Sequence, residues 1–348
     1  MKEAVIDSLH RRLVLLGREP GTQANDHPAA ATGDASAAAR LLFRKGFRRR
    51  VSLERRLAIE SKIRRSIEED RPLGLVVPFG GYKHFWNPSA PLVDWAEVFH
   101  LEFMIHHLTP LTSVIPAGVR IEYVSEDFIV PLMDNYLPAD LDRYAESFRA
   151  LVSRYQAVLP AGLAFDFWRL SERYDTATIT DVVLNAMPSR LSEFGSLDDD
   201  ARAIELKRST RSVNWRGWSD LTSLDTSERE ARVVYARVME KTFSDLGFLP
   251  EHVGGYYEAD LRSCVVFSWG TSLDNAVKQF LTLHSAPGST VDHWIGRGVV
   301  IPTRDERLRT TIVSRTQYEA SPWSKIPSRI ENLDSNLRNL ETVDLGIA

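Results

Sequence analysis

The chain has 348 residues, enough for one large domain or two modest ones. Hydrophobic residues make up 43 % and charged residues 26 %, which excludes a mainly disordered, collagen-like or fibrous protein. The single cysteine, Cys264, excludes an internal disulfide framework and a cysteine-rich zinc module, and it fits a reducing compartment. No apolar run approaches the ~20 residues that span a bilayer, and the first residues lack the pattern of a secretory signal. We therefore expect a soluble, cytoplasmic protein of enzyme size that makes no membrane contact.

Charge is nearly balanced, with 43 basic against 47 acidic side chains, which argues against a strongly basic nucleic-acid-binding domain. The distribution is uneven, because 11 basic residues and only two acidic ones lie between Arg40 and Arg65. Such a cluster could hold the phosphates of an RNA. The candidates at its centre are Arg48, Arg49, Arg50, Arg55 and Arg56. The alternative interpretation is that these basic residues form the solvent-exposed face of a helix and the segment that leads into it.

Three segments are expected along the chain. Residues 1–39 are predicted to form a short amphipathic helix and then a flexible linker, because residues 20–39 are rich in Pro, Gly, Ala and Ser. Residues 40–326 are predicted to form a single α/β catalytic domain, and residues 327–348 a C-terminal tail.

Within the central domain, an apolar stripe of Leu53, Leu57, Ile59, Ile63 and Ile67 predicts a helix over residues 52–70. Strands and helices then alternate. Strands are predicted at 74–79, 119–124, 162–168, 263–269, 279–284, 298–301 and 309–313. Helices are predicted at 95–108 and 139–158, and the stretch 176–247 is mostly helical. The fold class expected is therefore α/β, with a Rossmann-like, mainly parallel sheet flanked by helices and an extra helical segment.

Ligands of such sheets bind in loops at the carboxyl ends of strands. The first candidate loop follows the strand that ends at Phe79. Gly80 and Gly81 would let backbone N–H groups approach an anion, Lys83 supplies a positive charge or an amine, and His84 can transfer a proton near neutral pH. A tight turn with aromatic packing is the alternative interpretation.

Two further loops follow predicted strands. Glu126 and Asp127 come directly after the second strand and could point into a pocket or only form a turn. His284 ends a later strand, where it could serve as an acid or base or as a buried structural histidine. Asp94 and Glu97 have the spacing of a helix capping box, which would satisfy backbone donors without any chemistry. Arg216 could clamp an anion through two hydrogen bonds.

Several classes of enzyme are excluded by missing motifs. His100, His106 and His107 share a predicted helix, but the HExxH pattern is absent, so no metal site is expected. The GxSxG pattern of α/β-hydrolases is absent too. Cys264 lies in an apolar strand, where a thiol usually acts as a small hydrophobic group.

The order of these motifs resembles the isonitrile (isocyanide) synthases of the pyoverdine/dityrosine biosynthesis family. Val77-Pro78-Phe79 with Lys83 and Asn87-Pro88 is similar to that family's first loop, and Asp94 with Glu97 is similar to the helix start that follows. Later resemblances are Ala117 to Asp127, Arg216-Gly217 and Thr282-Leu283-His284. The resemblance covers residues 70–290.

The resemblance implies an enzyme that condenses the amine of an amino acid with ribulose 5-phosphate, without a metal or another cofactor. Lys83, His284 and His84 would be the catalytic groups, and Arg216 would bind an anion. Tyr82 and Trp86 would line the pocket with Phe85. The remaining substrate-binding positions would be Gly80, Gly81, Asn87, Asp94, Glu97, Glu126 and Asp127.

Two other functions stay open. The pocket could accept the aminoacyl end of a transfer RNA held by the basic segment, which would make the chain an aminoacyl transferase for a natural-product amine. The chain could also be an RNA-binding or scaffold protein without activity. The sequence does not decide the amino acid, the second substrate or the oligomeric state.

Overall fold

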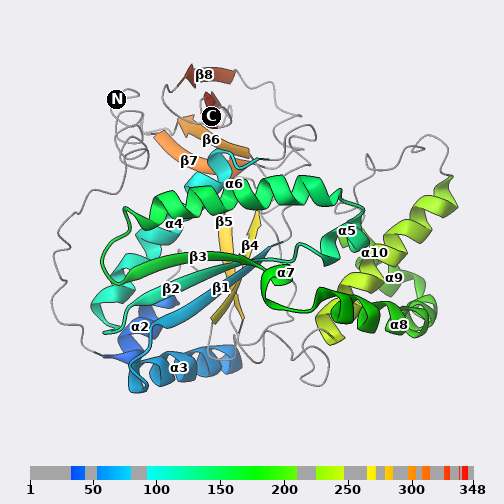
Figure 1. The fold of residues 1–348 in the computed structure, drawn as a ribbon, viewed down its shortest axis with the longest axis horizontal. Helices are drawn as coiled ribbons and strands as arrows, with labels where there is room; N and C mark the ends of the chain where they lie inside the picture. Colours follow the sequence, from blue (N-terminus) through cyan, green and yellow to red (C-terminus); the bar gives the residue numbers. More distant parts are fainter. Residues whose placement is uncertain are drawn as a thin grey trace.

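A five-stranded sheet lies at the centre of the computed structural model in Figure 1. The structure describes residues 33–43, 53–79, 92–209, 225–246, 265–271, 279–284, 297–302, 308–313, 325–329, 337 and 339–343. The sheet has the order β3-β2-β1-β4-β5. Its strands are β1 (Leu73–Phe79), β2 (Val119–Ser125), β3 (Leu163–Arg169), β4 (Val265–Thr271) and β5 (Gln279–His284). The first four are parallel and β5 is antiparallel to β4, so the prediction of a mainly parallel sheet is confirmed.

One face of the sheet is covered by α4 (Trp95–Leu108) and α6 (Pro138–Gln156). Side chains of β1, β2 and β3 alternate in direction, and Leu75, Val77 and Tyr123 point to this face, where all three are fully buried. The helix α6 runs alongside β3 (Figure 1). Both helices were predicted from the sequence to within two residues at each end.

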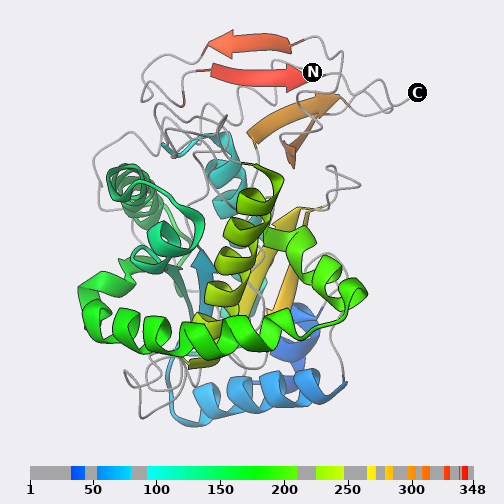
Figure 2. The ribbon, with the colours of Figure 1, turned by 90° about the vertical axis from the view of Figure 1, so that its right-hand side faces the viewer.

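The opposite face carries Val76, Val124 and Trp168, which pack in a second core. That core also holds residues of α5 (Ile129–Asp134), α8 (Thr176–Gly195) and α10 (Thr226–Leu246). The short helix α7 (Leu170–Arg173) follows β3, and α9 (Asp199–Ser209) packs against α10. Figures 1 and 2 show α8 and α10 on the side of the molecule toward which β1–β3 run. The extra helical segment expected from the sequence is therefore present beside the carboxyl ends of these strands.

The predicted linker is wrong at its end, because α2 (Ala35–Leu42) begins inside it. The Asp34 side chain caps this helix by accepting a hydrogen bond of 3.0 Å from Ala37 N. Alanine is the best helix former, and Ala38 and Ala39 are buried against α3 (Leu53–Glu68) and its surroundings. The alanine-rich composition, which indicated a linker, therefore supplies a helix and part of the core.

The stripe predicted for α3 is correct for Ile59 and Ile63, which are fully buried. It is wrong for Leu57, a residue that is 60 % exposed. Residues 57 and 59 are two apart, which places them on different sides of a helix.

A second, four-stranded sheet in the order β7-β6-β9-β8 was not predicted. Its strands are β6 (Arg297–Pro302), β7 (Leu308–Val313), β8 (Lys325–Arg329) and β9 (Asn339–Val343). β6 and β7 contact α4, and Leu337, just before β9, belongs to the main core with 2 % exposure. Residues 327–348 were expected to be a tail, and the described part of them instead contributes to a sheet and to the core.

Candidate functional site

The order of the sheet reverses between β1 and β4. The strands β2 and β3 lie on one side of β1, and the later strands β4 and β5 lie on the other. In open α/β sheets, ligands bind outside the carboxyl ends of strands at such a reversal. Phe79, Ser125 and Arg169 lie level with one another as the last residues of β1, β2 and β3. The candidate site is therefore this edge of the sheet.

The first predicted loop leaves β1 at this edge, directly after Phe79. Its candidate residues lie outside the described part of the chain: Gly80, Gly81, Tyr82, Lys83, His84, Trp86 and Asn87. The loop nevertheless begins at the candidate edge, because Phe79, the last residue of β1, pairs with Ser125, the last residue of β2. The roles of these residues stay predictions.

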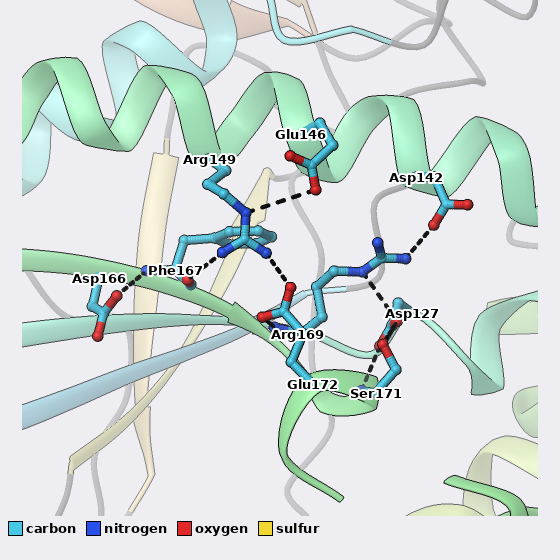
Figure 3. Close-up of polar contacts among 9 residues, drawn as sticks. All are labelled: Asp127, Asp142, Glu146, Arg149, Asp166, Phe167, Arg169, Ser171 and Glu172. Atoms are coloured by element: carbon cyan, nitrogen blue, oxygen red, sulfur yellow. Dashed lines mark hydrogen bonds and ion pairs between the residues drawn. The ribbon is translucent and has the colours of Figure 1, made fainter.

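Buried acidic side chains follow the end of β2. Glu126 and Asp127 are each 7 % exposed. Asp127 accepts hydrogen bonds from Ser171 N at 3.2 Å, from Arg169 Nε at 3.1 Å and from the Ser171 hydroxyl (Figure 3). These three donors from the end of β3 and the start of α7 compensate the burial of the carboxylate. Asp127 therefore ties the end of β2 to the end of β3.

Arg169 connects this turn to the helix above the sheet. Its guanidinium also donates to Asp142 of α6, and its side chain is only 17 % exposed. Burial alone would lower the pKa of Arg169, but the hydrogen bonds and charges of Asp142 and Asp127 outweigh it and raise that pKa. Sequence reasoning missed Arg169, Asp142 and Ser171, because the pairs join residues 27 to 44 positions apart. The available signal was an arginine directly after the strand predicted at residues 162–168.

The capping box predicted for Asp94 and Glu97 is present at the start of α4. Ala96 N donates to Asp94 Oδ1, and Asp94 N donates to Glu97 Oε2, both at 2.7 Å. Glu97 is completely buried and also accepts a hydrogen bond of 3.0 Å from the Tyr144 hydroxyl. Two carboxylates therefore already occupy the N-terminus of α4, which leaves little electrostatic preference for an anion there.

The third predicted loop begins away from the reversal edge. The strand β5 is antiparallel to β4. It therefore begins with Gln279 opposite Thr271, at the carboxyl end of β4, and ends with His284 opposite Val266. Val266 is paired with Val76 of β1, three residues before Phe79. The expectation that the end of this strand shares the edge with the ends of β1 and β2 is wrong. The side chain of His284 lies outside the description, and its catalytic role stays a prediction.

Of the basic candidates, Arg216 and Arg48 to Arg50 lie outside the described residues, and Arg55 is described only as part of the backbone of α3. Arg56 lies over the Phe43 ring, with its Cζ atom 5.5 Å from the ring centre. On the same helix, Arg64 and Arg65 pair with Glu60 and Glu69 one turn away. The described part of the basic segment thus shows the charge pairing of a solvated helix.

The histidines of α4 do not form a metal site in the described part of the chain, where no group of three metal-binding side chains occurs. His100 is completely buried, with its ring edge-on to that of Tyr123 at 5.5 Å. Burial lowers the pKa of His100 to about 3, so its ring is neutral near pH 7. Among the described helices, none has the length and apolar character needed to cross a membrane.

Fold and site together describe an α/β protein whose parallel sheet gathers polar residues at the carboxyl ends of its strands. Among solved structures, the chain is similar to the PvcA protein from Pseudomonas aeruginosa, with a TM-score of 0.56 and 15 % sequence identity. The likeness covers 88 % of this chain and 99 % of that one. No protein-family model matches the sequence, and no curated protein matches it. At this identity the likeness shows a shared fold.

Proposed function

We propose that the chain is a biosynthetic enzyme of the isonitrile synthase type, which modifies the amine of an amino acid with a small phosphorylated co-substrate. The observation that carries the proposal is the likeness to PvcA, an isonitrile synthase, over 88 % of this chain and 99 % of that one. The resemblance of the motifs to the same family, found from the sequence, agrees with it.

The positions of two motifs fit the proposal. The loop with Gly80, Gly81 and Lys83 begins at the carboxyl end of β1, and Glu126 follows the carboxyl end of β2 beside it. We assign the anionic group of the co-substrate to Lys83 and the two glycines, since the start of α4 is occupied by its own carboxylates. We assign the ammonium group of the amino acid to the carboxylate of Glu126, which follows Ser125, the last residue of β2.

Condensation of an amine with a sugar carbonyl requires the amine to lose a proton before it attacks. A histidine can accept that proton near neutral pH, and His84, in the loop that follows β1, is the proposed acceptor. Arg216 would bind a second anionic group, such as the carboxylate of the amino acid, and Tyr82, Trp86 and Asn87 would line the pocket.

The direct test incubates the purified chain with a pool of amino acids and ribulose 5-phosphate that is uniformly labelled with ¹³C. An isonitrile has one carbon more than the amine from which it forms. We expect mass spectrometry to detect a product of one amino acid that has gained one labelled carbon. Absence of any consumed amino acid in the presence of the sugar phosphate would overturn the proposal.

An additional arm replaces the sugar phosphate with charged transfer RNA and tests the aminoacyl transferase that the sequence left open. Consumption only in that arm would favour the transferase. Phosphate contacts would then make the affinity for RNA fall as the salt concentration rises. The slope of log K against the logarithm of the salt concentration would be about −0.7 for each contact to a phosphate of a single strand.

The matched variants are Lys83→Met and Lys241→Met, each of which removes one lysine charge. Lys241 lies on α10 with 48 % of its side chain exposed. We expect Lys83→Met to lower kcat/KM by about 100-fold, the loss typical of a charged hydrogen-bond donor to the substrate, and Lys241→Met to leave it unchanged. Equal activities of the two variants would remove Lys83 from the proposed site.

A further inference from the structure

The outer strand β3 has one edge that no other described strand covers. Among the strands that the structure describes, it pairs only with β2. Val119 N donates to Gly162 O at 2.7 Å, so the main-chain groups of Gly162 face β2. Because these groups alternate along a parallel strand, those of Leu163, Phe165, Phe167 and Arg169 face outward. An edge with free N–H groups is a template on which another strand can pair.

All four outward N–H groups of β3 already have an acceptor within the chain. Leu163 N donates to Pro160 O at 3.1 Å, in the connection before the strand. Phe165 N donates to Gln156 Oε1 at 2.9 Å, and Phe167 N to Asp166 Oδ1 at 2.8 Å. Arg169 N donates to Glu172 Oε2 at 3.1 Å. Three of the four acceptors are side chains, from the end of α6, from β3 itself and from α7.

The guanidinium of Arg149 covers the same edge on its acceptor side (Figure 3). Arg149 Nη1 donates to Phe167 O at 3.3 Å, and the guanidinium lies over the Phe167 ring at 4.8 Å from its centre. It also pairs with Glu172 and, at 3.7 Å, with Glu146. The N–H groups of Phe167 and Arg169 and the carbonyl of Phe167 are therefore all hydrogen-bonded to side chains of the same chain.

The covering groups lie at the surface. The side chains of Asp166 and Glu172 are 39 % and 40 % exposed, and Gln156 is exposed as well. An incoming strand would have to break these hydrogen bonds and move charged side chains away from Phe167 before it could pair.

We propose that β3 is closed to strand addition by its own neighbouring side chains, and that this closure prevents a second copy of the chain from pairing β3 against β3. A second copy is the relevant occupant, because it carries the identical outer strand, and two such edges can pair antiparallel about a twofold axis. The closure is independent of the proposed enzymatic activity.

The test removes the three side-chain acceptors together in the variant Gln156→Ala/Asp166→Ala/Glu172→Ala. The control Ser153→Ala/Asp181→Ala/Glu193→Ala removes two carboxylates and one neutral polar group from exposed positions of α6 and α8. Light scattering over a range of concentrations is expected to show self-association of the first variant, with its mass at least doubled, while the control stays as the parent. A folded first variant with the parent's mass at every concentration would overturn the proposal.

A second variant, Gln156→Glu/Asp166→Asn/Glu172→Gln, keeps an acceptor oxygen at each position and is expected to retain the parent's mass. Self-association of this variant as well would contradict a role for the acceptors. If the alanine variant does not fold, amide hydrogen exchange of the parent decides. The amides of Phe165 and Phe167 are expected to exchange slowly, and exchange at the rate of an unbonded surface amide would overturn the closure.

Discussion

At the scale of single residues, the ion pairs of Arg169 link the end of β3 to the turn after β2 and to α6. Arg169→Met would leave Asp127, whose side chain is 4 % exposed, without its charged partner. Removal of one partner of a buried pair is strongly destabilising, and we expect a loss of about 3 kcal/mol in the free energy of unfolding. Urea denaturation checks this value. Arg190→Met is the control, because Arg190 pairs with Glu193, which is 62 % exposed, and should cost less than 1 kcal/mol. Equal losses would contradict the role of Arg169.

His100 makes the stability of the protein depend on pH. Its pKa is about 3 in the folded chain and near 6.5 in an unfolded one. Between these values only the unfolded state takes up the proton, so stability falls as the pH drops below 6.5, by about 1.4 kcal/mol per unit for this residue. Thermal or urea unfolding from pH 7 to pH 4 should show a shallower decline for His100→Phe than for the parent. His106→Phe, at an exposed position of α4, should keep the parent's slope. A parallel decline for all three proteins would rule out His100 as the cause.

Sequence reasoning at this scale found the residues whose partners are local. Asp94 and Glu97 are three positions apart, and their spacing alone predicted the capping box that the structure contains. Asp127 and Ser171 are 44 positions apart, and no local pattern connects an acidic turn with a helix that starts so much later. Polar residues at strand ends could therefore be named as candidates, while their partners could not.

At the scale of elements, substitutions of Asp94, the N-cap of α4, distinguish a structural role of this residue from a substrate-binding one. Asp94→Ala should cost about 1 kcal/mol, since Ala96 N loses its acceptor, whereas Asp94→Asn keeps an acceptor oxygen and should cost little. If Asp94 acts only as a cap, Asp94→Asn also keeps full activity in the labelled-sugar assay. A stable Asp94→Asn variant that loses activity would assign Asp94 to the substrate site.

The start of β2 depends on Gly118, which has φ +84° and lies against the backbone before β3. A Cβ atom at this position would lie 2.3 Å from the carbonyl oxygen of Gly162. The left-handed backbone and the clash together should make Gly118→Ala cost about 3 kcal/mol or more. Gly195→Ala, at the end of α8 with no atom within 4 Å of the added carbon, should cost less than about 0.5 kcal/mol. Chemical denaturation measures both, and a cost of Gly118→Ala as small as that of Gly195→Ala would contradict this close approach.

Most elements were predictable because their signals are local. Apolar runs mark the strands, and caps or prolines mark the starts of α4 and α6. The alanine-rich α2 was missed because composition alone does not distinguish a linker from a helix that finds a partner. The direction of β5 was missed too, since its apolar run reads the same whether its neighbour is parallel or antiparallel.

At the scale of the whole molecule, the parallel sheet, the helices on its faces and the additional helical segment agree with the fold expected from the sequence. The second sheet does not, because strands β6 to β9 were assigned to the end of the main domain or to a tail. The likeness to PvcA covers 88 % of this chain and 99 % of that one, so the two proteins share a fold over most of their length.

The measurement that tests the central proposal most directly is the transfer of carbon from ¹³C-labelled ribulose 5-phosphate to an amino acid by the purified chain. We expect a product that carries one labelled carbon on the former amine, which the Lys241→Met variant forms as the parent does and the Lys83→Met variant forms in strongly reduced amount. An unlabelled product, or amino acid consumed only with charged transfer RNA, would contradict it.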